Sequence, residues 1–121
     1  MPILKLEVVG PMEPTLRAGL AQAVADAAVT VLASQPQGTW VRVYDVPEAD
    51  YAENGVAEAG IRPVFVTVLK HHHAEGPALA YELRLLTDAI AAACDRPVEH
   101  VHLLYEDAAR GRLAFGGKLV D

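Results

Sequence analysis

The chain has 121 residues, 52% of them hydrophobic and only 6% aromatic, which predicts one folded domain over residues 1–121 and excludes a disordered chain. Its formal net charge of −6 argues against nucleic acid or an anionic membrane as a partner. Cys94 is the single cysteine, so no internal disulfide can form. With no secretory signal and no run long enough to span a membrane, we expect a cytoplasmic protein.

The chain begins Met1-Pro2, and a strand rich in branched aliphatic residues follows as ILKLEVV. Because methionine aminopeptidase removes an initiator Met that precedes a small residue, we expect the mature chain to begin at Pro2. Pro2 would then be the only free secondary amine of the protein. An amine that carries either a proton or a lone pair near neutral pH can act as a general acid or base.

The first half continues with a helix and a second strand. Glu13-Pro14 is expected to open the helix, since proline is tolerated in the first helical turn, and Pro36 to follow its end. The second strand reads TWVRVYDV. Apolar residues at helical spacing form one stripe, which consists of Leu16, Leu20, Val24, Ala27 and Val31.

The second half repeats this pattern. Pro63 precedes the strand VFVTVLK, Gly76-Pro77 opens a helix, and Pro97 precedes the strand HVHLLYED. The second helix carries the apolar stripe Leu79, Leu83, Leu86, Ile90 and Ala93. The leading prolines and the post-helix prolines are both 61 residues apart. We therefore predict two tandem βαβ units, about 1–60 and 61–121, each with parallel strands around a right-handed crossover.

Pairing the two units predicts an α/β (α+β) domain: a four-stranded mixed sheet with both helices on one face. The opposite face is then uncovered and carries Ile3, Val9 and either Trp40 or Val41, depending on the register. An apolar face on so small a domain predicts an oligomer. The turn-forming pairs Asn54-Gly55 and Gly116-Gly117 predict short hairpins at subunit contacts.

The chain as a whole resembles the tautomerase superfamily. The resemblance is carried by the initial Met1-Pro2, the βαβ unit of about sixty residues, and the tail ARGRLAFGGKL with its Gly-Gly turn. The second half is similar to 4-oxalocrotonate tautomerase subunits. The whole looks like members with two fused units, such as malonate semialdehyde decarboxylase and cis-3-chloroacrylic acid dehalogenase. The resemblance implies the tautomerase (MIF-like) fold, a homotrimer of fused chains, catalysis by the N-terminal proline, and no metal or organic cofactor.

Site residues follow from the resemblance one position at a time. Pro2 matches the catalytic proline, whereas Pro63 is an internal imide and cannot be a catalytic amine. Arg42 matches an arginine that binds the substrate carboxylate, a role suited to the two parallel hydrogen bonds of a guanidinium. The corresponding residue of the second half is His102, a departure from the pattern.

After the third strand, fused members carry arginines near the proline, whereas this chain has Lys70-His71-His72-His73. His71 and His73 match the two arginines of the decarboxylase and would share one face of an extended strand. We therefore expect Lys70, His71 and His73 to contact substrate, with histidine charges that depend on pH near neutrality. Zinc binding by the histidines is disfavoured, because neighbouring strand residues point in opposite directions and cannot supply three ligands to one ion.

These residues support two enzymatic interpretations and one non-catalytic one. A neutral Pro2 predicts a cofactor-free tautomerase or isomerase acting on a small 2-oxo or 2-hydroxy-enoic acid, that is, a small carboxylate substrate. A protonated Pro2 favours a hydratase, decarboxylase or dehalogenase of three-carbon acids. Such reactions also need a carboxylate that activates water, for which the candidates are Asp45, Glu53, Glu106 and Asp107. A chain that retains Met1 favours a trimeric scaffold without catalysis.

Overall fold

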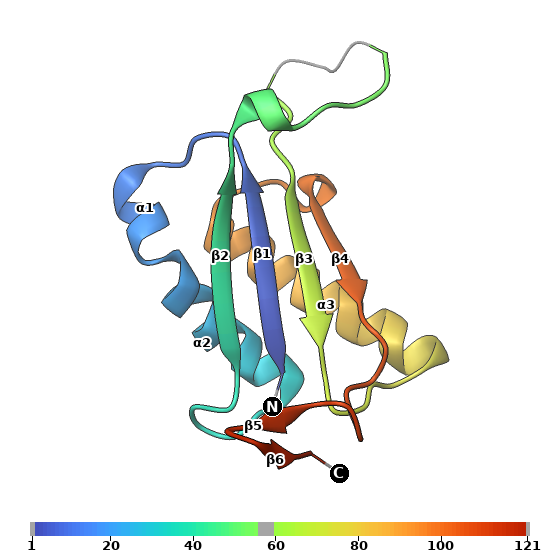
Figure 1. The fold of residues 1–121 in the computed structure, drawn as a ribbon. Helices are drawn as coiled ribbons and strands as arrows, with labels where there is room; N and C mark the ends of the chain where they lie inside the picture. The colour runs from blue at the N-terminus through green and yellow to red at the C-terminus, as the bar shows by residue number, and fades with distance from the viewer. Residues whose placement is uncertain (1, 56–59, 121) are drawn as a thin grey trace.

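The computed structural model describes residues 2–55 and 60–120. Four long strands and two long helices dominate it, and short helical turns and a small hairpin complete it (Figure 1). In chain order the elements are β1 (Ile3–Val9), α1 (Pro14–Ala18), α2 (Leu20–Leu32), β2 (Trp40–Val46), η1 (Glu48–Asp50), β3 (Val64–Leu69), α3 (Gly76–Cys94), η2 (Val98–His100), β4 (Val101–Tyr105), β5 (Ala114–Phe115) and β6 (Lys118–Leu119).

The four long strands form one mixed sheet in the order β2-β1-β3-β4. β1 runs parallel to β2, and β3 runs parallel to β4, as two βαβ units require. The two units meet through the antiparallel pair of β1 and β3 at the centre of the sheet. Figure 1 shows α2 and α3 side by side behind the sheet, with the other face open. The predicted mixed sheet with helices on one face is confirmed.

The core lies between the sheet and the two long helices. Alternate residues of the central strands are fully buried there, because successive side chains of a strand point to opposite faces. These residues are Leu4, Leu6 and Val8 of β1 and Val64, Val66 and Val68 of β3. They pack against Leu20 and Val24 of α2 and against Leu86 and Ile90 of α3.

The first predicted helix is divided into two at Gly19, which ends α1 and precedes α2. The fully buried residues of α2 are Leu20, Val24, Ala28 and Leu32, which follow one another at intervals of four. Of the expected stripe, Leu20 and Val24 are fully buried, Val31 is partly buried against the core, and Leu16 and Ala27 are half-buried. In α3 the expected Leu86 and Ile90 are buried, together with Ala91 and Cys94.

The uncovered face of the sheet carries large apolar side chains among charged and polar ones. Its large exposed side chains are Trp40 (47% exposed), Tyr44 (49%), Phe65 (37%) and Leu104 (67%). The register Ile3↔Trp40 puts Trp40 on this face, while Val41 packs against the core. Val9, which was expected on the same face, is only 1% exposed. It lies at the end of β1, where Pro63 and Arg96 bond to its backbone and enclose it.

The predicted Gly116-Gly117 hairpin is present as β5 and β6. Both glycines have positive φ angles (56° and 87°), which glycine adopts without a steric penalty. The Phe115 ring contacts the Trp40 ring edge-on at 4.9 Å, so the hairpin leans against the uncovered face. The hairpin predicted at Asn54-Gly55 would continue through residues 56–59, which lie outside the described residues. Within the described parts of the chain, no helix is long and apolar enough to cross a bilayer.

Candidate functional site

Pro2 lines a cavity of about 310 Å³ at one end of the central strands. The walls come from the C-terminal end of α2 and from the segment that follows β3. The cavity is lined by Pro2, Leu32, Ala33, Ser34, Gln35, Lys70, His71 and His72. The structure therefore brings together three residues that the sequence singled out, Pro2, Lys70 and His71.

The sheet fixes the position of Pro2. Its carbonyl oxygen accepts a hydrogen bond from the Trp40 amide at 3.0 Å, which extends the β1–β2 pairing by one residue. Pro2 is buried, and it shares the parity of Leu4 and Leu6, whose side chains point toward the helices. The antiparallel register ends at Ile3↔Leu69, so Pro2 and Lys70 are the next residues beyond this pair, and both line the same cavity.

The histidine run does not continue β3 as an extended strand. β3 ends at Leu69, and residues 71 and 72 form a bend. The expected alternation is therefore wrong, and His71 lines the cavity together with His72 rather than with His73. The Arg110 amide fixes this bend by donating a hydrogen bond to the His71 carbonyl oxygen at 3.1 Å.

One imidazole atom of this bend has no hydrogen-bond partner. His71 Nε2 is buried and is unpaired within the described residues. A buried polar atom without a partner is costly, and binding a ligand with a complementary polar atom would remove that cost. Because His71 lines the cavity beside Pro2, its imidazole is a candidate contact for a bound molecule.

Lys70 is held by a carboxylate that the sequence analysis did not single out. Its ammonium Nζ donates to Glu82 Oε1 at 3.0 Å and to Oε2 at 3.3 Å. The Tyr105 hydroxyl donates to the same Oε2 at 2.5 Å. Glu82 precedes the buried Leu86 and Ile90 by four and eight residues and so lies on the same stripe of α3. A carboxylate on the buried stripe of a helix is the sequence signal that could have identified Glu82 as a candidate site residue.

The other predicted site residues lie outside this cavity. Arg42 lines a separate cavity of about 270 Å³ on the uncovered face, together with Lys5 and Glu106. His102 is on the same face and packs against Phe65, with ring centroids 5.5 Å apart. The His73 ring instead contacts the Tyr105 ring at 5.9 Å.

None of the four candidate water-activating carboxylates lines the Pro2 cavity. Asp45 forms an ion pair with Arg17 at 2.8 Å, and Glu53 accepts the hydroxyl of Tyr51 at 2.5 Å. The Cys94 thiol is also unsuited to nucleophilic chemistry at neutral pH, because burial raises its pKa to about 11. Within residues 2–55 and 60–120, no group of three His, Cys, Asp or Glu side chains is arranged to hold a metal ion.

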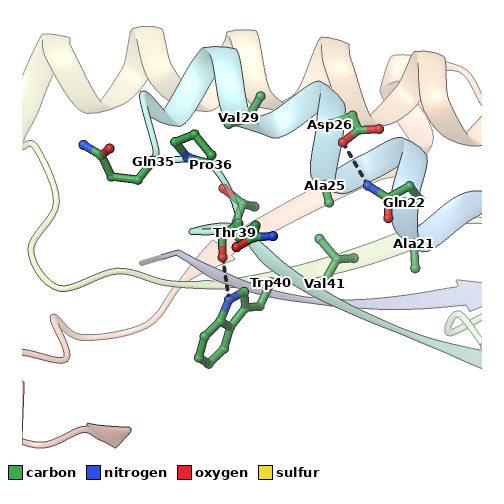
Figure 2. A pocket seen from close by; sticks show the side chains of 11 residues that line it. Ala21, Gln22, Ala25, Asp26, Val29, Gln35, Pro36, Thr39, Trp40 and Val41 are labelled. Carbon is green, nitrogen blue, oxygen red and sulfur yellow. Dashed lines mark hydrogen bonds between the residues drawn. The ribbon is translucent and has the colours of Figure 1, made fainter.

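A larger cavity lies elsewhere in the molecule. It measures about 660 Å³ and lies between α2 and β2, as Figure 2 shows. Its only carboxylate, Asp26, accepts a hydrogen bond from Gln22 at 2.9 Å, and the Trp40 indole donates to the Gln37 carbonyl at 3.0 Å. Among the residues that the structure describes, no other ionisable side chain lines this cavity, so it has fewer groups that could act as an acid, a base or a charged ligand contact than the smaller cavity beside Pro2.

Comparison with solved structures identifies the fold. A fused 4-OT in a wild-type symmetric trimer superposes with a TM-score of 0.77 over 98% of this chain and 94% of that chain, at 18% identity. Pt0534 inactivated by 2-oxo-3-pentynoate gives a TM-score of 0.78 over 98% and 94%, at 13% identity. The chain has the tautomerase fold. Malonate semialdehyde decarboxylase is a further neighbour of this tautomerase-fold chain, with a TM-score of 0.70 over 94% and 90%, at 16% identity.

The fold that the resemblance implied is thus confirmed, including its two-unit form. A macrophage migration inhibitory factor-like protein from Entamoeba histolytica also shares the tautomerase fold, with a TM-score of 0.67 at 8% identity. No protein-family model matches the chain, and no curated protein matches it. At these identities the comparisons establish the fold, and the chemistry of the site has to be argued from its own residues.

Proposed function

We propose that this chain is a cofactor-free tautomerase or isomerase that acts on a small 2-oxo or 2-hydroxy-enoic acid. Removal of Met1 frees the Pro2 nitrogen, which accepts a proton from the enol or from the carbon next to the carbonyl. The same nitrogen then returns the proton at the other end of the conjugated system, so no cofactor is consumed. The structural neighbours, a fused 4-OT and malonate semialdehyde decarboxylase, support this class of chemistry.

One observation carries the proposal: Pro2 lines a small cavity that also contains imidazole groups. A volume of about 310 Å³ suits a small acid. His71 supplies a buried nitrogen that lacks a partner, and we propose that it contacts the polar end of the substrate. Lys70 contributes an ammonium group to the site, where it pairs with Glu82. We propose that His73 supports the site indirectly, through the contact between its ring and the Tyr105 ring.

Arg42 and His102 belong to the uncovered face, so we propose that they act at a boundary between subunits of a homotrimer. Arg42 is exposed and has no ion-pair partner among residues 2–55 and 60–120. Its guanidinium is therefore free to bind the substrate carboxylate of a neighbouring site. The trimer reported for the fused 4-OT supports this arrangement. A cytoplasmic location stays a prediction.

The hydratase, decarboxylase or dehalogenase interpretation is the second candidate. It gains support from the structural similarity to malonate semialdehyde decarboxylase. It needs a carboxylate that activates water, and the one beside this site, Glu82, is already bonded to Lys70 and Tyr105. The arrangement within one chain therefore favours proton transfer by Pro2 alone.

The proposal is tested by measuring the ketonisation of phenylenolpyruvate and 2-hydroxymuconate. The assay uses protein whose intact mass shows that Met1 has been removed. Pro2→Ala is expected to lower kcat/KM by about 10²–10⁴, the usual contribution of a positioned general base. Pro36→Ala is the matched control, because Pro36 is exposed and lies outside the Pro2 cavity. Absence of turnover by the folded, demethionylated protein would rule out the tautomerase proposal.

A second test detects the free amine without turnover. In a 2-oxo-3-ynoate the carbonyl polarises the alkyne, so a neutral amine adds to the β-carbon and its proton moves to the α-carbon, with no leaving group. We expect 2-oxo-3-pentynoate to add its full mass to the peptide that begins with Pro2. Blocking the amine by retention of Met1 should abolish this labelling. Labelling elsewhere, with Pro2 untouched, would contradict a nucleophilic Pro2.

A further inference from the structure

A mostly buried ion pair joins Lys70, which lines the Pro2 cavity, to Glu82 of α3. The two side chains are only 17% and 18% exposed, and Lys70 Nζ lies 3.0 Å from Glu82 Oε1. The Tyr105 hydroxyl donates a further hydrogen bond to Glu82. Burial and the neighbouring Glu82 carboxylate raise the pKa of Tyr105, so this hydroxyl remains a donor throughout the neutral range. The Glu82 carboxylate thus accepts hydrogen bonds from two sides.

Lys70, one member of the ion pair, shares its cavity with Pro2. The β1–β3 register ends at Ile3↔Leu69, so Pro2 and Lys70 are each the next residue beyond this antiparallel pair. Lys70 is also the only Lys or Arg that lines this cavity within the described part of the chain. Its charge is therefore the fixed cation to which an amine at Pro2 would be most sensitive.

We propose that Glu82 is a positioning residue that sets the basicity of the Pro2 nitrogen by holding the Lys70 ammonium in a neutral pair. An unpaired ammonium beside an amine disfavours its protonation, and an unpaired carboxylate favours it. Paired as they are, the two charges largely cancel at Pro2. The nitrogen then remains basic enough to take a proton from the substrate. This inference rests on the proposed function, because it requires a free amine at Pro2.

The other groups around Pro2 are not themselves changed by substitutions in this pair. His71 and His72 face the cavity from the bend after β3, and Ser34 and Gln35 face it from the end of α2 without charge. The last carbonyl groups of α2 contribute a partial negative charge. Arg110 lies behind the bend and reaches it through the His71 carbonyl. On the opposite face of the sheet, the charged groups Lys5, Arg42 and Glu106 line the separate cavity.

The experiment measures the pKa of Pro2 by NMR titration of protein labelled with ¹⁵N-proline, with the pH dependence of kcat/KM as a second readout. Glu82→Gln leaves Lys70 unpaired and should lower the Pro2 pKa by about one pH unit. Lys70→Met leaves Glu82 unpaired and should raise it by a similar amount. The double variant removes both charges and should return the pKa to within about 0.3 of the wild-type value. In Glu82→Gln the acid limb of the pH–rate profile moves to lower pH, because the base is neutral over a wider range.

Two controls separate charge from structure. Tyr105→Phe removes the third member of the network but keeps both charges, so the Pro2 pKa should change little. Asp88→Asn removes an exposed carboxylate farther along α3 and should not change it. Opposite shifts in the two single variants, cancelled in the double variant, would support the inference.

The other outcomes are distinguishable. A Pro2 pKa that is the same in every variant, with turnover retained, would overturn the role of Glu82 and leave the proposed function intact. Shifts of the predicted signs in a protein without turnover would support the role of Glu82 and contradict the tautomerase proposal. A Pro2 nitrogen that does not titrate, because Met1 is retained, would overturn both.

Discussion

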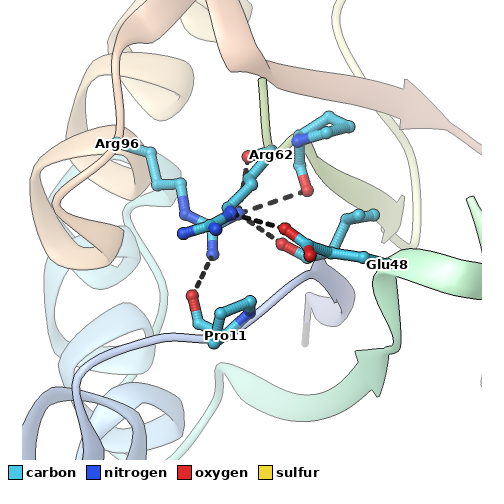
Figure 3. Close-up of polar contacts among 6 residues, drawn as sticks. Pro11, Glu48, Arg62 and Arg96 are labelled. Atoms are coloured by element: carbon cyan, nitrogen blue, oxygen red, sulfur yellow. Dashed lines mark hydrogen bonds and ion pairs between the residues drawn. The ribbon is translucent and has the colours of Figure 1, made fainter. Parts of the chain in front are cut away.

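Arg96 bonds to two backbone segments, residues 9–11 and 62–63, at the end of the sheet opposite the Pro2 cavity (Figure 3). One guanidinium nitrogen donates to the carbonyl oxygens of Val9 at 2.9 Å and Arg62 at 2.5 Å, and a second approaches the carbonyl of Pro11 at 3.4 Å. Burial lowers the pKa of Arg96, although the side chain remains charged at any ordinary pH. Its charge strengthens these hydrogen bonds to the carbonyl oxygens.

We predict that Arg96→Met lowers the free energy of unfolding by about 2–3 kcal/mol, because it removes charged donors from several enclosed carbonyl groups. Urea denaturation followed by circular dichroism measures the change. Arg110→Met, a matched change at an exposed arginine, should have little effect. Equal stability of the two variants would show that the contacts of Arg96 contribute nothing net.

At the scale of elements, the end of α2 forms part of the wall of the Pro2 cavity. Ala33 caps this helix in the left-handed conformation, with φ of 50°, where a side chain is strained. Its neighbour along the chain, Ser34, is hydrogen-bonded to Thr39, which connects the cap to the loop before β2. The chain thus keeps a strained residue at a position that lines the candidate site.

Ala33→Gly should therefore stabilise the protein by about 0.5–1 kcal/mol, since glycine adopts this conformation without strain. Ala23→Gly, an exposed position inside the same helix, should destabilise it by about 1 kcal/mol. Thermal denaturation of both variants checks the opposite signs. A loss of stability in Ala33→Gly would contradict the assignment of strain to the cap.

At the scale of the whole molecule, the sheet has one face covered by helices and one face without a cover. Four large apolar side chains are exposed on the uncovered face, and Leu104 is the most exposed of them. Exposed apolar patches of this kind mark interaction sites. The proposed homotrimer would bury this face and would bring Arg42 to a subunit boundary.

Leu104→Glu is expected to break the assembly into smaller species, because a charge would be buried in an apolar contact. Sedimentation-velocity experiments at several protein concentrations measure the change. Tyr81→Glu is the matched control, since Tyr81 is 59% exposed on α3, on the helix-covered side. A Leu104→Glu protein that sediments like the wild type would contradict assembly through this face.

The sequence by itself determined the two-unit fold. Hydrophobic periodicity and the spacing of prolines are local signals, and they were enough to predict the strands, the two long helices and the Gly116-Gly117 hairpin. Pro2 was also identifiable, because its position after Met1 is a property of the sequence. The sequence analysis did not predict the division of the first helix, although Gly19 stands at the position where the helix divides.

Only the tertiary structure decided which of the candidate residues meet. The register of β1 with β3 brought Pro2 and Lys70 to the same end of the sheet, and the bend after Leu69 placed His71 and His72 at the cavity that Pro2 lines. Arg42 and His102 were separated from them because they occupy the other face of the sheet. Glu82 lies twelve residues after Lys70 in the sequence, on a separate element, the helix α3, and accepts a hydrogen bond from Lys70. Contacts between separate elements depend on register and packing, which local sequence patterns do not encode.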